Sequence, residues 1–369
     1  MHIAIFGAGL VGQRTARALV AHGFKNVVLI SQTRQGAPSD GVTVGQGWPH
    51  PEVKGADIVV LATESAHQPA MAIPLVKSGI HVVTTADNPA DIKQLWALDD
   101  TATEAGAALV IGAAYSPGLS TLLASYLVRT LDTVDTISTA QFGTGGPACA
   151  QEHHRAMGST AHEVHEGVLR TSRGGSGREL VWFPDPVAAA DCYRAGLADP
   201  FLLHQAFPTV RRIESRQAAT RRDRLTSRLP MLRPPHAEGL VGAVWAEVRG
   251  HVDGRAEHRA MAATAPQATG AAAMAAAVCC ELAGQLSGED GEPDFRRGAQ
   301  SAASNENPVS LLQLVSNDVR LWAYDGSQIV TASGETEPIH AARKWRSAGE
   351  NVAIAMFFQC LIARRGSFA

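Results

Sequence analysis

A glycine-rich turn, Gly7-Ala8-Gly9-Leu10-Val11-Gly12, directly follows a short apolar run at the start of the chain. The first glycine permits a tight bend, the second lets the backbone approach a pyrophosphate, and the third lets a following helix pack on the strand. The free N–H groups at the start of that helix attract phosphate. The turn therefore predicts a dinucleotide-binding site, and a purely structural glycine turn is the alternative.

The second apolar run, residues 27–30, ends at Ser31-Gln32-Thr33-Arg34. A cofactor with a free 2′-hydroxyl is usually matched there by Asp or Glu, about 20 residues after the turn. This chain has two hydroxyls and a guanidinium instead, and an Arg fork suits a 2′-phosphate. We expect NADP, with NAD possible, held by Ser31, Thr33 and Arg34. Arg34 could also be an ordinary solvated loop residue.

Titratable side chains gather at residues 152–160. A histidine titrates near neutral pH and can donate a proton as hydride arrives. The pattern places His153 and His154 just before an expected helix that opens at Ser159 with a capping box at Thr160. A helix N-terminus can hold a carboxylate. We expect His153 or His154 to be the proton donor and Ser159 and Thr160 to contact the substrate. The alternative is a solvated loop followed by an ordinary helix cap.

Other candidate chemistry is less specific. Arg211 could meet a substrate carboxylate, although arginines at this density are more often solvated. His162 and His165 could join the earlier histidine pair in a metal site, but no zincin or deaminase spacing is present and hydride transfer from a nicotinamide needs no metal, so we expect none. Gly-x-Ser-x-Gly is absent, which leaves hydrolase chemistry without support.

Strands and helices must position these residues, and their alternation through residue 111 predicts a doubly wound parallel sheet. The expected strands are residues 2–6, 27–30, 58–61, 81–84 and 108–111. Ligands of such sheets bind beyond the carboxyl ends of the strands. We therefore add Ala62, Thr63, Glu64 and Asp87 to the cofactor contacts.

The stretch Gly112-Ala113-Ala114-Tyr115-Ser116-Pro117-Gly118-Leu119-Ser120 resembles the crossing point of the saccharopine dehydrogenase-like reductases, which carry a Gly-x-x-x-x-Pro-Gly-Leu-type stretch there. In that family it lies beside the nicotinamide and starts the second domain. The resemblance covers the first 130 residues well, is looser over about 135–285 and fades in the last 80. It implies cofactor contacts from Ala113, Ala114 and Pro117, and we assign Tyr115 to the substrate.

The histidine segment also resembles the Glu-x-His-His…Ser-Gly-Thr-Ala motif of the dihydrodipicolinate reductases, another two-domain nicotinamide family. In those enzymes the His pair sits by the reduced bond and the Gly-Thr turn holds a carboxylate. This chain departs from the pattern, because the motif's Lys has no counterpart and the spacing from Arg155 to Ser159-Thr160 is shorter.

From residue 134 onwards the pattern favours a second α+β domain with a mixed or antiparallel sheet. Its clearest element is a hairpin around Asp253-Gly254, a typical type I′ turn. An Ala-rich helix over 269–286 lacks polar periodicity and should be buried; the resemblance implies that it returns to the cofactor domain, and a core helix of the second domain is the alternative. Further expectations are a strand at 134–142, a loop-like segment at 143–158, a strand at 178–183, an exposed loop at 220–235, a loop-like segment at 287–306, a hairpin at 319–330 and a helix at 338–364. We expect three segments: 1–118, 119–266 and 267–369.

Composition narrows the class of protein. A formal net charge of −3 gives no basic field for nucleic acid or anionic lipid, and 5% aromatic residues argue against base-stacking platforms. Five cysteines without a C-x-x-C make a disulfide framework or zinc knuckle improbable. We expect no signal peptide before the first strand, and no uninterrupted apolar run reaches the roughly 20 residues that span a bilayer. We expect a cytoplasmic protein with a small-molecule substrate, no nucleic-acid or membrane partner, and, from the resemblance, a homodimer.

These observations predict an NADP-dependent oxidoreductase, and the resemblance implies a C=N or C–N bond in an amino-acid-like, carboxylate-bearing substrate. One alternative is a sugar or polyol oxidoreductase of the glucose–fructose oxidoreductase type. That family usually has Glu-Lys-Pro after its fifth strand, where this chain has Thr85-Ala86-Asp87-Asn88-Pro89. The other alternative is a non-catalytic NADP-binding sensor, since a fold does not fix a function.

Overall fold

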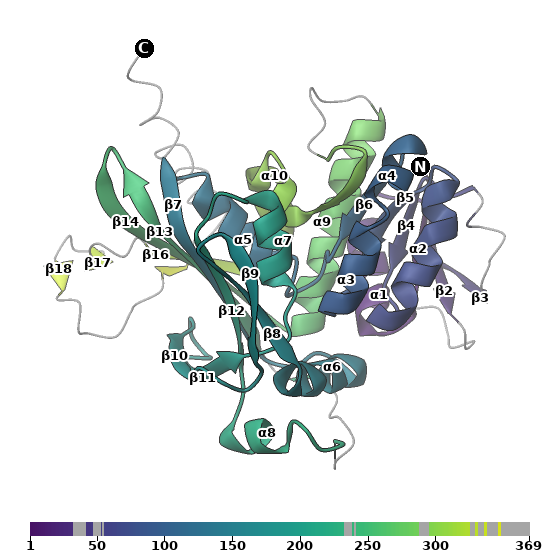
Figure 1. Cartoon of the computed structure of the whole chain (residues 1–369). Coiled ribbons are helices and arrows are strands. Elements are labelled where there is room, and N and C mark those ends of the chain that lie inside the picture. Colours follow the sequence, from purple (N-terminus) through teal and green to yellow (C-terminus); the bar gives the residue numbers. More distant parts are fainter. Residues whose placement is uncertain are drawn as a thin grey trace.

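The structure is a computed structural model, and it describes residues 1–31, 42–46, 53, 55–231, 238–239, 241–287 and 295–324 together with short strands at 329–330, 336–337 and 346–347. Within these residues the chain forms two large sheets, and Figure 1 shows helix α9 (Gln267–Ser287) running between them. The expected fold class, a doubly wound parallel sheet followed by an α+β domain, is confirmed.

The first sheet is parallel and has the strand order β15-β6-β5-β4-β1-β2-β3 over the described residues. Its central strands read as continuous apolar runs because helices cover both faces. Alternate residues of β1 face opposite sides: Ile3 and Ile5 join one buried cluster, and Ala4 and Phe6 join the other. The strands are β1 (Ile3–Phe6), β2 (Val27–Ser31), β3 (Val42–Gln46), β4 (Ile58–Leu61), β5 (His81–Thr84), β6 (Ala108–Ile111) and β15 (Gly298–Ser301).

Short helices connect these strands. They are α1 (Leu10–Ala21), the 3-10 turn η2 (Ser65–His67), α2 (Gln68–Lys77), α3 (Pro89–Trp96) and α4 (Asp99–Glu104). Asn88 caps α3, because its Oδ1 accepts a hydrogen bond from the N–H of Ala90 at 2.9 Å, and Pro89 occupies the first helical position.

The second sheet has the order β10-β11-β12-β7-β13-β14-β16-β19, with β8 paired to both β12 and β9. All described pairs are antiparallel except β12 with β7. The expected hairpin forms between β13 and β14, and both Asp253 and Gly254 take positive φ. The strands are β7 (Thr133–Phe142), β8 (Thr160–His165), β9 (Val168–Arg173), β10 (Glu179–Trp182), β11 (Ala189–Arg194), β12 (Arg212–Ala218), β13 (Gly242–Val252), β14 (Arg255–Ala265), β16 (Arg320–Tyr324) and β19 (Arg346–Ser347).

The remaining helices pack beside this sheet or between the sheets. They are α5 (Leu119–Val128), α6 (Pro147–Gly158), α7 (Asp199–Ala206), α8 (Arg221–Thr226) and α10 (Pro308–Val315), with the 3-10 turn η3 (Ala302–Ser304). Helix α9 packs against α1, so it returns to the first domain as the resemblance implies. By length and composition its Gln267–Leu286 window could cross a membrane, yet 67% of that window is buried inside the protein, as in a core helix.

Two expectations around the histidine segment are wrong. Residues 147–158, taken as a loop, form helix α6, which begins at Pro147, a favoured first helical residue. Residues 160–165, taken as a helix, form strand β8, in which Ala161 and Val164 are buried. The hairpin turn at Glu166 and Gly167, both with positive φ, pairs β8 with β9 and makes the strand favourable.

Several expectations for the rest of the chain are also wrong. Residues 298–301, within a stretch taken as a loop, add strand β15 to the first sheet, and its Gly-Ala-Gln-Ser sequence carries no β-branched signal. Helix α8 lies in the expected loop at 220–235. Strand β16 pairs with β14 and β19, while β17 (Ile329–Val330) pairs with β18 (Thr336–Glu337), so the hairpin expected at 319–330 is not formed. The helix expected at 338–364 is a strand at 346–347 and otherwise lies outside the described residues.

Candidate active site

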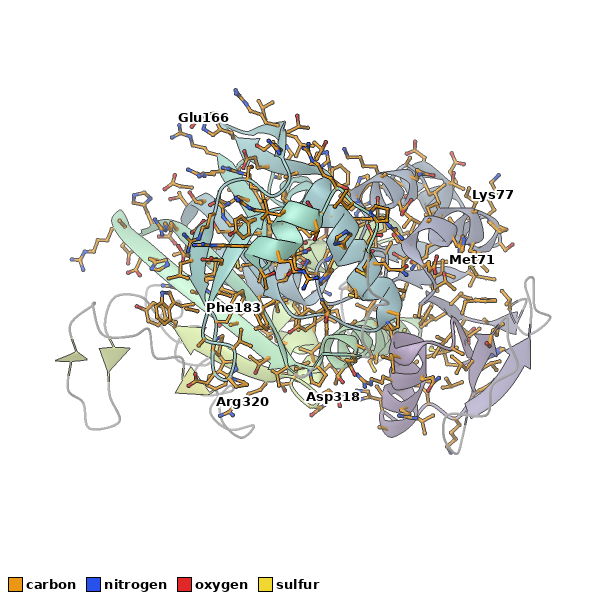
Figure 2. All side chains as sticks on the ribbon, turned by 90° about the horizontal axis from the view of Figure 1, so that it is seen from below. Met71, Lys77, Glu166, Phe183, Asp318 and Arg320 are labelled. Carbon is orange, nitrogen blue, oxygen red and sulfur yellow. The ribbon has the colours of Figure 1, made fainter. Side chains whose placement is uncertain are left out.

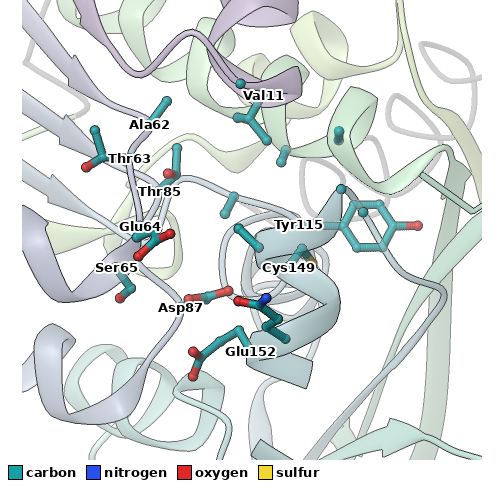
Figure 3. A pocket seen from close by; sticks show the side chains of 18 of the residues that line it. Val11, Ala62, Thr63, Glu64, Ser65, Thr85, Asp87, Tyr115, Cys149 and Glu152 are labelled. Carbon is teal, nitrogen blue, oxygen red and sulfur yellow. The ribbon is translucent and has the colours of Figure 1, made fainter. Parts of the chain in front are cut away.

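A cavity of about 450 Å³ opens at the carboxyl ends of β1, β4 and β5, beneath the start of α6 and the start of α9. Figure 3 shows side chains from both domains converging on it. Many of the residues selected from the sequence line it: Gly7, Gly9, Leu10, Val11, Ala62, Thr63, Glu64, Asp87, Ala114, Tyr115 and His153. The cavity is therefore the candidate active site.

The glycine turn has the geometry that a pyrophosphate requires. Gly7 has φ of +108°, and a Cβ there would lie 2.3 Å from the carbonyl oxygen of Ala62. A Cβ on Gly12 would lie 1.8 Å from the Gly7 carbonyl oxygen, whereas a Cβ on Gly9 would meet nothing within 4 Å. Gly7 and Gly12 thus bring α1 against the strands, and Gly9 leaves open space at the cavity wall.

The start of α1 is prepared for an anion. No side chain caps its first turn, and that turn has no acidic residue to neutralise the positive end of the helix dipole. The side-chain amide Nε2 of Gln13 donates a hydrogen bond to the Ala8 carbonyl oxygen at 2.7 Å and holds the turn in shape. These residues fit a dinucleotide phosphate group.

Other predicted cofactor contacts lie behind the wall or outside the described residues. Ala8 and Gly12 shape the turn without lining the cavity, and Ser31 is buried at the end of β2. Ala113 and Pro117 lie in the crossing stretch, where the N–H of Ala113 bonds to the Thr84 carbonyl at 2.7 Å. Thr33 and Arg34 lie outside the described residues, so the NADP preference stays a prediction.

A buried carboxylate that was not selected from the sequence holds the crossing stretch, residues 112–120. Asp199 of α7 accepts hydrogen bonds from Ser116 at 3.0 Å and from Ser120 at 2.5 Å, and more weakly from Thr139. Burial raises the pKa of Asp199, and the hydroxyl donors counter part of that rise. Since Ser116 lines the cavity, Asp199 fixes one of its walls from behind.

His153 is the member of the histidine pair that reaches the cavity. Its Nε2 lies 3.2 Å from Nε2 of Gln267 and 3.6 Å from Sγ of Cys149, and the Cys149 thiol donates to the Gln267 Oε1 at 3.3 Å. Burial lowers the pKa of His153, although the nearby Asp87 and Glu152 partly offset the effect. The imidazole is therefore neutral near pH 7.

Asp87 provides a titratable carboxyl beside this histidine. It follows β5, is half-buried and lines the cavity; no other described side chain donates a hydrogen bond to it. Burial, followed by the charge of Glu152, raises the pKa of Asp87 to about 7. In Figure 3 the Asp87 and Glu152 side chains lie near each other, from the loop after β5 and from α6. A carboxyl poised near neutral pH can both take and return a proton.

The remaining predicted substrate and catalytic residues do not reach the cavity. His154 turns away, with its Nε2 at 2.9 Å from the Leu229 carbonyl oxygen. Ser159 and Thr160 are exposed at the end of α6 and the start of β8. Arg211 pairs with Glu166 on the surface, and Figure 2 shows Glu166 on the opposite side of the molecule from Lys77 of α2. His154, Ser159 and Thr160 were selected around an expected helix at 159, which is a strand instead, and Arg211 was selected because its guanidinium could meet a substrate carboxylate.

Three further lining residues were missed by sequence reasoning. Cys149 and Gln267 hold the His153 ring, and Asn88 donates a hydrogen bond to Glu152 at 2.9 Å. Gln267 opens α9, far from His153 along the chain, and only the return of that helix to α1 brings the two together. Among the described residues no group of three or more His, Cys, Asp or Glu side chains has a metal-binding arrangement.

Fold and cavity together define a two-domain protein with a Rossmann-type dinucleotide-binding domain. No family model matches the sequence, and no curated protein matches it. Among solved structures, apo saccharopine dehydrogenase (L-Glu forming) from Saccharomyces cerevisiae is similar with a TM-score of 0.63 at 12% identity, covering 88% of this chain and 99% of that one.

An engineered D-amino acid dehydrogenase is similar with a TM-score of 0.51 at 13% identity, covering 86% of this chain and 99% of that one. The same kind of enzyme bound to NADP⁺ gives 0.50 at 12% identity, with the same coverage. At these identities the likeness shows a shared fold. It agrees with the resemblance carried by residues 112–120.

Proposed function

We propose that the protein is an NADP-dependent oxidoreductase that acts on a C=N or C–N bond of a small amine substrate. The supporting observation is that one cavity contains both the glycine turn, whose helix N-terminus suits a phosphate, and the half-buried pair Asp87 and His153. The nicotinamide supplies or accepts the hydride when bound. The protein has to hold the substrate against it, exclude water and move one proton.

Asp87 is our candidate for the proton. In the oxidative direction an ammonium must lose a proton before hydride can leave the neighbouring carbon, and a carboxylate with a pKa of about 7 can accept it. In the reductive direction the protonated carboxyl returns it to the new amine. His153, the proton donor predicted from the sequence, is neutral and held by Gln267, so in this proposal it lines the cavity beside Asp87 and is not the group that supplies the proton.

The test is a turnover assay with NADP⁺ and a panel of amines and amino acids, run in parallel with NADPH and 2-oxo acids or aldehydes plus amine. Asp87→Asn should lower kcat by about a hundredfold or more while leaving NADPH binding unchanged. Tight NADPH binding without turnover of any substrate would instead favour the sensor alternative. Turnover of polyols in preference to amines would favour the sugar oxidoreductase alternative.

A further inference from the structure

The charges that line the cavity are unevenly balanced. Four carboxylates line it, from Glu64, Asp87, Asp91 and Glu152, and among the described lining residues Arg155 supplies the single guanidinium. Arg155 is already bound to Glu152, with 2.5 Å between its Nη1 and Oε2. Asn88 donates a hydrogen bond to the other carboxylate oxygen of Glu152. The cavity therefore has acids in excess of the cations that could pair with them.

Glu64, Asp87 and Asp91 are the carboxylates without a hydrogen-bonded side-chain donor among the described residues. Asp91 lies in the first turn of α3, where the helix dipole partly balances its charge. Asp87 has no such compensation: it is half-buried, and it lines the cavity. A partly desolvated carboxylate with no paired cation is stabilised when a bound cation completes it.

The two ends of the cavity differ in the charge they attract. The start of α6 lies against the start of α1, since a Cβ on Gly146 would lie 3.2 Å from Cδ1 of Leu10. Both helix N-termini therefore lie at the end of the cavity beside the glycine turn, where their positive dipole ends attract the cofactor phosphates. Figure 3 shows Asp87 and Glu152 on the side of the cavity away from Val11. Among the described lining residues, the substrate end has the acids and no cation free to bind a carboxylate.

We infer that the substrate is an aliphatic diamine or polyamine, with one amino group at Asp87 and a second ammonium held by Asp91 and Glu64. The inference rests on the proposed function and revises the carboxylate-bearing substrate expected from the sequence. The residues expected to bind that carboxylate, Ser159, Thr160 and Arg211, all lie outside the cavity. Recognition of the second charge separates such a substrate from a simple monoamine.

Three probes separate these classes: 1,5-diaminopentane, L-lysine, which adds one carboxylate to the same skeleton, and pentylamine, which lacks the second amine. Their dissociation constants are measured by calorimetry on the full chain, with and without NADP⁺. The diamine should bind at least about tenfold more tightly than either of the others. The measurement is repeated with diamines of three, four and six carbons, because the spacing of the two ammonium sites sets the best length.

Variants assign the sites. Asp87→Asn should weaken diamine binding by at least about tenfold, and the double variant Asp91→Asn, Glu64→Gln should bring the diamine close to pentylamine. Asp100→Asn, an exposed acid of α4, is the matched control and should change nothing. Equal or tighter binding of L-lysine, no binding of any diamine, or unchanged affinity in the Asp87 variant would overturn the inference.

Binding and turnover distinguish the two proposals. Diamine binding that depends on Asp87, without reduction of NADP⁺, would contradict the proposed function and leave the inference intact. Reduction of NADP⁺ with L-lysine preferred over the diamine would contradict the inference and leave the proposed function intact.

Discussion

Asn88 donates a hydrogen bond from Nδ2 to Oε1 of Glu152 at 2.9 Å, and this bond joins the loop after β5 in the first domain to α6 in the second. It holds the charge of Glu152 near Asp87, where that charge is the second cause, after burial, of the raised Asp87 pKa. This hydrogen bond between the two domains therefore contributes to the raised pKa of Asp87, the candidate catalytic group.

Glu152→Gln should lower the pKa of Asp87, since it removes a neighbouring negative charge and keeps the shape of the side chain. Amine oxidation needs the Asp87 carboxylate, so in wild type kcat/KM should rise with pH through about 7. In the variant the rise should move to lower pH by about half a unit to one unit. An unmoved or upward-shifted profile would contradict the assignment, and His154→Asn, on the same helix but turned away from the cavity, serves as the control.

Asp87→Asn should stabilise the protein at high pH. The folded-state pKa of about 7 lies above the ordinary value of 3.8, so between these values the folded state keeps a proton that the unfolded chain has lost. Stability of the wild type therefore falls as pH rises through this window. The variant should melt about 2–4 °C higher at pH 8, with the difference shrinking towards zero near pH 4. Equal melting temperatures at both pH values would show that Asp87 is solvated in the folded state.

The histidine pair gives a matched comparison on one helix. His153→Asn should reduce kcat by about tenfold or more, because His153 faces the cavity and Asp87. His154→Asn should leave kcat near wild type, since His154 bonds to Leu229 away from the cavity. Steady-state kinetics with the best amine substrate measures both. Equal losses, or a larger loss in the His154 variant, would remove His153 from the site.

Arg34→Ala tests the choice of cofactor. If the Arg34 guanidinium holds a 2′-phosphate, the variant should lose NADPH affinity by about tenfold or more and change NADH affinity little. Fluorescence titration of both nucleotides gives the two dissociation constants. The prediction fails if both nucleotides weaken equally, or if wild type prefers NADH.

Much of the first domain could be predicted because its signals are local. The glycine turn and the strands near residues 58–61, 81–84 and 108–111 have their signals in contiguous residues, and their carboxyl ends meet at one edge of the sheet. The hairpin at Asp253-Gly254 is local as well. Glu64 and Asp87, which were predicted as cofactor contacts for this reason, line the cavity.

The substrate end could not be predicted because it depends on contacts between distant parts of the chain. Asp87 meets α6, and His153 meets Gln267 of α9, only once the two domains are packed. The segment around Ser159 has a polar composition that fits a helix cap, yet the pairing of β8 with β9 and β12 makes it a strand. Propensity is weak evidence when tertiary pairing is available.

Titration of the wild-type protein and its Gly12→Ala variant with NADPH, followed by nicotinamide fluorescence, tests whether the glycine turn binds a nicotinamide dinucleotide. A Cβ at residue 12 would lie 1.8 Å from the Gly7 carbonyl oxygen, so the variant must shift the phosphate turn. Gly23, just after α1, has a φ of +92°, so Gly23→Ala strains the backbone away from the phosphate turn and controls for a general loss of stability. We expect saturable NADPH binding to wild type and to the Gly23 variant, and at least about a hundredfold weaker binding to the Gly12 variant. Absence of NADPH and NADH binding to the wild type would contradict it.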